Sequence, residues 1–361
     1  MRRFFNPLIR LVWGTWLHKV PINPDAVTKI AICPAGGIGD SITILPIISL
    51  LKRLCPSANI DIITIERNAI IFNNNSDIHA IHIIYTDEDW KKMRVNSYSL
   101  IFVLNWIHIS EWAIRAWKIG GYHSIRVTPF QGEKYAALFS YQAKPISPPQ
   151  NVTDIYIALV EEVFGQTIAE SEKLLLPYSI ALPQDALEYG SHIVSQMSTE
   201  RYCVINYSVI HEKKQWHNDG YGAVAELLLR IMPHHTIIVL TMENDYESAK
   251  KCLYGLDEQR CFIPSPSQNV LHAIAMMRKA DFLFTVDTSF IHCCSAFGIP
   301  VFGLYIGEKH NAQLWSARNV PFAAVETHNG KPIRTLNTED VIVALEHFIR
   351  QYVLTKEIPY A

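Results

Sequence analysis

Short apolar segments typical of buried strands alternate with longer amphipathic segments along both halves of this chain. This alternation constrains the fold most, because strands that alternate with helices form βαβ units around a parallel sheet. In the first half we expect strands at 29–33, 59–65, 81–85 and 100–104, and helices at 41–54 and 111–118. In the second half we expect strands at 202–207, 236–241, 282–286 and 300–305, and helices at 221–231, 245–253, 270–279, 288–297 and 338–353.

The length of 361 residues suits two domains of this α/β kind, since a domain takes about 150 residues. We predict a short N-terminal segment at 1–20, Rossmann-like domains at 21–170 and 201–337, a linker at 171–200 and a C-terminal helix at 338–361. Pro46 should kink the first long helix or distort its first turn, and Thr338 should be the N-cap of the last one. Ligands of doubly wound domains bind at the carboxyl ends of the strands.

Composition and charge limit the classes of partner. The chain is 49% hydrophobic and 18% charged, which excludes a disordered protein, and its net charge of −2 gives no reason to expect nucleic acid binding. Residues 1–160 carry 16 basic and 11 acidic side chains, whereas residues 161–361 carry 16 and 23. The basic first half suits an anionic partner, or it is only a solvated face.

The cellular setting is indicated by the cysteines and the first residues. Seven cysteines show no CxxC pair and no metal-ligand spacing, which favours a reducing cytoplasm. Residues 1–20 mix basic with apolar and aromatic side chains. They predict an amphipathic helix that either lies on the inner face of the cytoplasmic membrane or packs on its own domain. No apolar run is long enough to predict a membrane-spanning helix.

A glycine-rich turn follows the first expected strand and opens a helix. Gly36, Gly37 and Gly39 let the backbone approach a ligand, and the helix start offers free N–H groups. A dinucleotide fingerprint fails here, because Pro34 stands at its first glycine position. Asp40 follows the turn directly and either faces the ligand or serves, with Ser41 as the alternative, as a helix N-cap.

A second motif joins the expected strand 282–286 to a helix. Asp287 ends the strand, and Thr288 and Ser289 open the helix with hydroxyl groups that could hold a diphosphate together with the backbone N–H groups. His292 falls one turn later on the face of Thr288 and Ser289. A capped helix with a buried histidine is the alternative interpretation.

Together the two motifs resemble glycosyltransferase family 9, the lipopolysaccharide heptosyltransferases. Three further features fit the family in order: Lys214 and Trp216 in a Lys-x-Trp segment, Glu243 after the strand 236–241, and the turn at 298–301. The resemblance covers about residues 28–310. The chain departs from the family pattern at Ser289, where glycine is common, and in the turn at 306–309, and Val209 and Ile210 follow Ser208 where hydroxyl residues are common.

The resemblance implies a GT-B fold in which two Rossmann-like domains face a central cleft, with the acceptor bound in the first domain and a nucleotide-sugar donor in the second. It also implies that the helix at 338–361 packs back toward the first domain. The implied reaction is an inverting transfer, most simply of heptose from ADP-heptose, to a lipopolysaccharide or lipooligosaccharide core, without metal or cofactor.

The implied site has named roles. Asp40 is the general base, beside the turn of Gly36, Gly37 and Gly39, and Lys214 stabilises the leaving phosphate. Donor binding falls to Ser208, Lys214, Glu243, Asp287, Thr288, Ser289 and His292. An anionic glycolipid acceptor would meet a set of basic residues in the first half: Arg67, Lys91, Lys92, Arg94, Arg115, Lys118, Arg126 and Lys134.

Three alternatives stay open on the sequence. The acid-x-acid string at 87–89 is of the kind that holds a divalent cation, although it leads into what resembles an exposed turn, so we expect no metal site there. A nicotinamide-dependent oxidoreductase would also alternate strands and helices, but it leaves the motif at 287–292 without a purpose. A transferase-like protein that binds a glycan or nucleotide without turnover is the third.

Overall fold

The computed structural model describes residues 20–34, 36–93, 97–104, 109–121, 123–130, 136–143, 150–197, 199–266, 269–308 and 310–357. The predicted amphipathic segment therefore lies outside the described residues, apart from Val20, and so do Arg94 and Lys134. The chain divides into two units, Met1–Ala181 and Leu182–Ala361, which are treated separately below.

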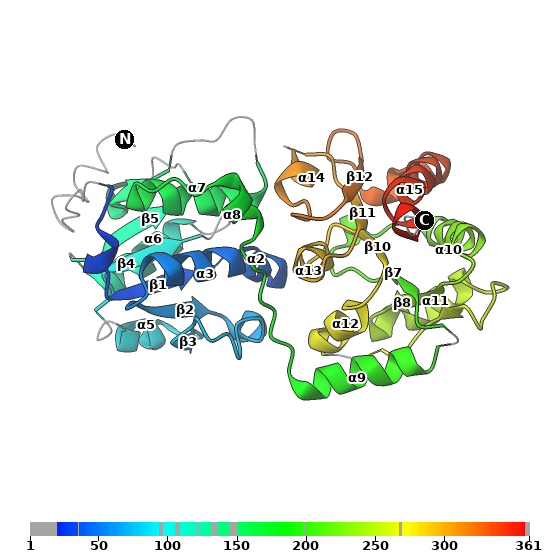
Figure 1. Cartoon of the computed structure of the whole chain (residues 1–361), viewed down its shortest axis with the longest axis horizontal. Helices are drawn as coiled ribbons and strands as arrows, with labels where there is room; N and C mark the ends of the chain where they lie inside the picture. The colour runs from blue at the N-terminus through cyan, green and yellow to red at the C-terminus, as the bar shows by residue number, and fades with distance from the viewer. Residues whose placement is uncertain are drawn as a thin grey trace. The chain divides into compact units, whose positions relative to one another are not determined.

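The first unit is built on a sheet of six parallel strands (Figure 1). The strands are β1 (Lys29–Cys33), β2 (Asn59–Thr64), β3 (Ala80–Ile83), β4 (Leu100–Val103), β5 (Ile125–Thr128) and β6 (Tyr141–Gln142). Their order is β3-β2-β1-β4-β5-β6, so the direction of the chain across the sheet reverses between β1 and β4. Ligands of such sheets bind at this reversal, beyond the carboxyl ends of the strands.

Helices of the first unit cover both faces of the sheet, since right-handed crossovers on either side of β1 run in opposite directions. They are α2 (Ile38–Thr43), α3 (Leu45–Leu54), α4 (Glu66–Ala69), α5 (Asp87–Met93), α6 (Ile109–Gly120), α7 (Val152–Phe164) and α8 (Glu170–Leu174), with 3-10 turns at Pro24–Ala26 and Ala136–Leu138. The break expected at Pro46 is confirmed, because α2 ends at Thr43 and Pro46 lies in the first turn of α3. α5 and α6 cover one face through Trp90 and Trp112, whose rings pack edge to face.

A buried carboxylate on β2 contacts side chains near the amino ends of β1, β3 and β4. The Asp61 side chain on β2 is fully buried and accepts hydrogen bonds from Tyr98 (2.9 Å), His79 (3.0 Å) and His82 (3.1 Å). Lys29 Nζ lies 3.3 Å from Asp61 Oδ2. Burial alone would raise the pKa of Asp61, but the hydrogen bonds and Lys29 together hold it well below its usual range. The network lies at the amino ends of the strands, whereas the glycine turn lies at their carboxyl ends. We therefore assign it to the stability of the first unit and not to ligand binding.

Replacing Asp61 with asparagine should destabilise the first unit by about 3 kcal/mol at pH 7. The new NH2 group would replace an oxygen that accepts hydrogen bonds and would face hydrogen-bond donors instead. Since the folded pKa is depressed, the contribution of the carboxylate is complete above the unfolded pKa of about 3.9 and is lost as pH falls. The advantage of the wild type should therefore shrink by about 1 kcal/mol at pH 3. Urea unfolding at both pH values measures it. Asp25→Asn, at an exposed site, is the control, and an equal loss in the two variants would contradict the role of Asp61.

The second unit repeats the architecture with another six-stranded parallel sheet. Its strands are β7 (Tyr202–Asn206), β8 (Thr236–Leu240), β9 (Cys261–Phe262), β10 (Phe282–Val286), β11 (Val301–Tyr305) and β12 (Phe322–Glu326). The order β12-β11-β10-β7-β8-β9 places the reversal between β7 and β10. The predicted fold class, two doubly wound parallel α/β sheets, is confirmed.

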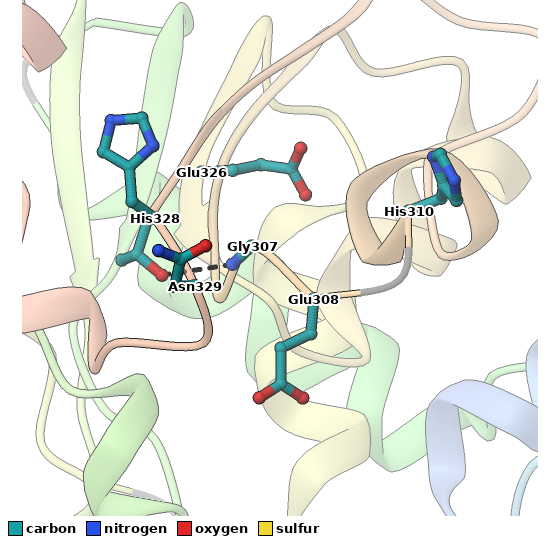
Figure 2. A pocket seen from close by; sticks show the side chains of 7 residues that line it. Gly307, Glu308, His310, Glu326, His328 and Asn329 are labelled. Atoms are coloured by element: carbon teal, nitrogen blue, oxygen red, sulfur yellow. Dashed lines mark hydrogen bonds between the residues drawn. The ribbon is translucent and has the colours of Figure 1, made fainter.

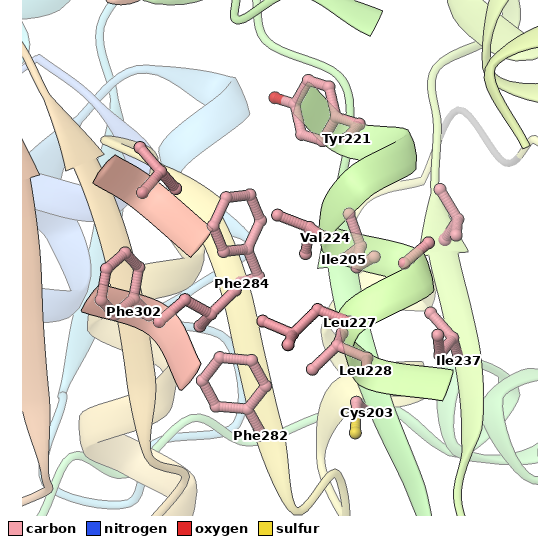
Figure 3. Packing of buried hydrophobic residues seen from close by; sticks show 14 of the residues in the cluster. Cys203, Ile205, Tyr221, Val224, Leu227, Leu228, Ile237, Phe282, Phe284 and Phe302 are labelled. Atoms are coloured by element: carbon pink, nitrogen blue, oxygen red, sulfur yellow. The ribbon is translucent and has the colours of Figure 1, made fainter. Parts of the chain in front are cut away.

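The helices of the second unit bury a core rich in aromatic side chains. They are α9 (Gln184–Ser195), α10 (Asn218–Ile231), α11 (Tyr246–Cys252), α12 (Val270–Met277), α13 (Phe290–Phe297), α14 (Asn311–Leu314) and α15 (Thr338–Tyr352), with 3-10 turns at Glu212–Lys214, Glu243–Asp245, Ile333–Thr335 and Leu354–Glu357. Figure 3 shows Phe282, Phe284 and Phe302 of the sheet packed between helices. α15 contributes Leu345 and Phe348 to this same core. Its contact with the first domain stays a prediction.

One local expectation was wrong. The N-cap of α15 is Asn337, whose Oδ1 accepts from the N–H groups of Glu339 and Asp340, and Thr338 is the first helical residue. The range predicted as the linker, 171–200, contains the helix α9. This helix packs closely on α12, because a Cβ built on Gly190 would lie only 2.9 Å from the Ala275 backbone. Within the described part of the chain, no helix is long and apolar enough to cross a membrane.

Candidate functional site

The glycine turn of the first unit holds Asp40 by a direct backbone contact. β1 ends at Cys33 and α2 starts after its N-cap, Gly37. The Gly37 N–H donates to Asp40 Oδ2 at 2.8 Å, which forms one half of a capping box. A Cβ on Gly37 would lie 2.8 Å from the same oxygen, so a larger residue here would have to displace the Asp40 carboxylate from this position. Neither Asp40 nor Ser41 is the N-cap itself; Asp40 is instead held at the carboxyl end of β1, half-buried, with Gly36 and Gly39 beside it.

The turn is also attached to the neighbouring strand. Gly36 O accepts hydrogen bonds from Arg67 Nη2 at 2.7 Å and from Asn68 Nδ2 at 3.3 Å. Both donors belong to α4, the short helix that directly follows β2. The turn after β1 and the helix start after β2 are therefore connected at the carboxyl ends of the strands, and β1 is one of the two strands that flank the reversal where ligands bind.

In the second unit, Lys214 and Asp287 form an ion pair at the equivalent edge. Lys214 Nζ lies 2.6 Å from Asp287 Oδ2 and donates to the Asp287 carbonyl at 3.1 Å. Lys214 comes from the turn after β7 and Asp287 from the end of β10, the two strands that flank the reversal. Asn311 Nδ2, at the start of α14, also donates to Asp287 Oδ2 at 3.3 Å. The carboxylate thus holds the ammonium group at the helix start.

Below this pair, polar side chains fix the hydroxyl of Thr288. Thr288 Oγ1 lies 3.1 Å from Thr285 Oγ1, and Asn206 Nδ2 donates to both hydroxyls, at 3.0 Å to Thr285 and 3.4 Å to Thr288. Ser289 is the N-cap of α13, and its side chain makes no capping hydrogen bond. The structure therefore brings Lys214, Asp287, Thr288 and Ser289 together at one helix start.

His292 lies behind this helix start and is 6% exposed. Burial lowers its pKa to about 4; Asp287 opposes this shift and Lys214 adds to it. The ring is thus neutral at pH 7. It packs against the Trp315 ring in a T-shaped arrangement, with the ring centroids 6.0 Å apart. A neutral imidazole near Lys214 can donate or accept a hydrogen bond but adds no charge to a bound anion.

Ser208 and Glu243 lie on two adjacent loops, after β7 and β8. The Met242 N–H donates to Ser208 Oγ at 2.8 Å, so the nearly buried serine hydroxyl joins the two loops. Glu243, the next residue, opens the 3-10 turn after β8 and is exposed. All seven predicted donor residues thus follow the carboxyl ends of three neighbouring strands, β10, β7 and β8.

A pocket of about 380 Å³ extends this edge to β11 and β12 (Figure 2). The Gly307 N–H donates to Thr327 Oγ1 at 3.1 Å, and the Ala312 N–H donates to Glu326 Oε1 at 3.2 Å. The lining residues are Gly307, Glu308, His310, Glu326, Thr327, His328 and Asn329. This lining offers the carboxylates of Glu308 and Glu326 as acceptors to hydroxyl groups. Gly307 and Glu308, from the turn that departs from the family pattern, thus line a polar pocket.

Several residues of the site were missed or misjudged from the sequence. Asn206, Thr285 and Asn311 were missed; a polar residue that ends a buried strand could have indicated Asn206, whereas no local signal marks Asn311. Arg126 is buried, with its guanidinium donating to the carbonyls of Leu138, Gly121 and Ser124, so it cannot meet an acceptor.

The acid-x-acid string at 87–89 begins α5. Asp89 accepts from the N–H groups of Tyr85 (3.1 Å) and Thr86 (2.9 Å), the role of an acid in a helix's first turn. In the part of the chain that the structure describes, no three His, Cys, Asp or Glu side chains gather in a way that could hold a metal ion.

A comparison with models of protein families identifies one family. The model of glycosyltransferase family 9 (heptosyltransferase) matches residues 89–339. A comparison with curated proteins finds no match. Among solved structures, the chain is similar to a family 9 glycosyl transferase from Veillonella parvula, with 16% identity and a TM-score of 0.72, over 92% of this chain and 99% of that one.

Two structures from E. coli give the same result. ADP-heptose lps heptosyltransferase II is 15% identical with a TM-score of 0.67, over 92% of this chain and 100% of that one. Heptosyltransferase WaaC with ADP is 14% identical with a TM-score of 0.67, over 91% and 99%. These likenesses show the GT-B fold, and the family model spans more than two thirds of the residues. This chain belongs to glycosyltransferase family 9, a family of nucleotide-sugar-dependent transferases.

Proposed function

We propose that this enzyme transfers heptose from ADP-heptose to a hydroxyl group of a lipopolysaccharide or lipooligosaccharide core, with inversion at the anomeric carbon and without a metal ion. The observation that carries the proposal is the ammonium group of Lys214, held by Asp287 beside the hydroxyls of Thr288 and Ser289 at the start of α13. A cation, hydroxyl groups and helix N–H groups at one point are suited to a diphosphate.

The donor lies along the edge of the second sheet in this proposal. The diphosphate contacts Lys214 and the start of α13, and Glu243 accepts hydrogen bonds from the ribose hydroxyls. Ser208 and the neutral His292 support the same site by hydrogen bonding. The solved structure of WaaC with ADP, a relative of the same fold, supports adenine as the base.

The acceptor reacts at the first unit. Asp40 takes the proton from the acceptor hydroxyl while its oxygen attacks the anomeric carbon. The bond from that carbon to the β-phosphate oxygen breaks, and the electron pair leaves with the diphosphate, whose developing charge Lys214 stabilises. Attack from the side opposite the leaving group inverts the anomeric centre. The basic first half suits an anionic glycolipid, and the proposal therefore includes a cytoplasmic enzyme that contacts the inner face of the cytoplasmic membrane.

Binding of ADP tests the donor half of the proposal. Saturating ADP should raise the melting temperature of the intact chain by several degrees, since ligand at 100 times Kd stabilises by about 2.7 kcal/mol. Hydrogen exchange should slow around 206–214 and 287–292 and not around 36–41. UDP, GDP and NAD are the comparison ligands. Protection of the glycine turn by NAD would favour the oxidoreductase instead, and a stronger response to UDP or GDP would contradict adenine as the base.

A further inference from the structure

Arg67 donates a hydrogen bond to the turn that carries the candidate base Asp40. Arg67 Nη2 donates to Gly36 O at 2.7 Å, and the N–H of the next residue, Gly37, donates to Asp40 Oδ2 at 2.8 Å. The guanidinium and the carboxylate are thus held at the two ends of one trans peptide group, the guanidinium at its carbonyl oxygen and the carboxylate at its N–H, which point in opposite directions. Arg67 is the second residue of α4, directly after β2, so it lies at the carboxyl edge of the sheet.

The other basic residues of the first half are placed differently. Lys91, Lys92 and Lys118 lie in the last turns of α5 and α6, helices that by then have run away from the carboxyl edge. Arg115 pairs with Glu111 and lies over the rings of Trp90 and Trp112. Arg67, by contrast, donates directly to the turn that carries Asp40.

The Arg67 side chain has the capacity to bind an anion. It is exposed, and a guanidinium carries five N–H donors in a planar fork that matches a carboxylate or a phosphate. Gly36 O takes a hydrogen bond from one of its nitrogens. The turn leaves room next to it, because a Cβ built on Gly36 would meet no atom within 4 Å beyond its chain neighbours.

We propose that Arg67 binds an anionic group of the acceptor, a phosphate or a carboxylate, next to the hydroxyl that Asp40 deprotonates. This inference rests on the proposed function and adds a requirement: the reacting hydroxyl must lie within about one sugar unit of a negative charge. Arg67 is then a specificity-determining residue, since an acceptor without the charge loses the bidentate pair and an acceptor with it is fixed in position.

The test uses three small probes on the intact chain: glucose 6-phosphate, glucuronate and glucose. We expect one or both anionic sugars to bind at least fivefold more tightly than glucose, measured by NMR titration. In Arg67→Gln this preference should disappear, and Arg67→Lys should retain part of it. The anion whose preference disappears identifies phosphate or carboxylate as the natural group. The preference should also weaken as salt is added.

Arg53→Gln is the matched control, because Arg53 is an exposed arginine of the same unit that pairs with Glu172 instead. It should keep the preference. Arg67→Gln should still fold, since Asn68 keeps its hydrogen bond to Gly36 O. An unchanged preference in Arg67→Gln, or none in the wild type, would overturn the proposal. ADP binding in the same samples reports on the donor site separately: its failure would contradict the proposed function and leave the Arg67 result readable.

Discussion

Asp40→Asn is expected to lower the turnover number by a factor of about 10² to 10⁴, the usual contribution of a general base. An asparagine has nearly the same shape, and its amide oxygen can accept the Gly37 N–H in place of Asp40 Oδ2. The start of α2 should therefore survive the change. What is lost is the ability to take a proton from the acceptor hydroxyl, so the effect should appear in kcat and not in the Kd of ADP.

Release of ADP from ADP-heptose in the presence of acceptor measures this effect. Asp77→Asn serves as the control, because Asp77 also holds a local contact in the first unit, to Ser49 Oγ at 3.2 Å, but lies elsewhere. Melting temperatures of both variants should stay close to that of the wild type. A turnover number within threefold of the wild type in Asp40→Asn would remove Asp40 as the base and leave it a helix-capping residue.

The two sheets could be predicted from the sequence because their signal is local. The strands 29–33 and 282–286 coincide with β1 and β10, since each is a continuous apolar run bounded by polar or helix-breaking residues. The short strands β6 and β9 have two residues each, too few to produce a pattern. At the start of α15, Asn337 and Thr338 are both good N-caps, and only the backbone geometry selects Asn337.

The candidate site could be predicted only in part, because its motifs are local and its contacts are not. The sequence indicated Asp287 and Lys214 separately, but their pairing joins residues 73 positions apart and depends on the neighbouring positions of β7 and β10. Asn311 reaches Asp287 from a four-residue helix that has no motif of its own. Likewise, eight basic residues were equivalent on the sequence, and only the fold distinguishes Arg67 from the buried Arg126.

Lys214→Met is expected to lower kcat about 10²- to 10³-fold and to weaken ADP binding as well. The substitution removes the charge that stabilises the leaving diphosphate. It also leaves the Asp287 carboxylate, 2.6 Å from the ammonium in the wild type, without its cation at a site that must accept an anion. Lys213→Met is the matched control, because Lys213 is the adjacent residue of the same 3-10 turn and is exposed. Equal losses of kcat and ADP affinity in the two variants would contradict a specific contact between Lys214 and the diphosphate, and would indicate that only the local positive charge matters.

The double variant Lys214→Met/Asp287→Asn separates the two effects of Lys214. If Asp287 acts mainly by holding the ammonium group, Asp287→Asn alone should reduce kcat less than Lys214→Met does. Adding it to Lys214→Met should then restore part of the ADP affinity, since the unpaired carboxylate no longer repels the diphosphate. Calorimetric titration of ADP into the four proteins of this cycle measures the coupling. Strictly additive losses would show that Asp287 and Lys214 act on the donor independently, and the ion pair would then be a feature of folding alone.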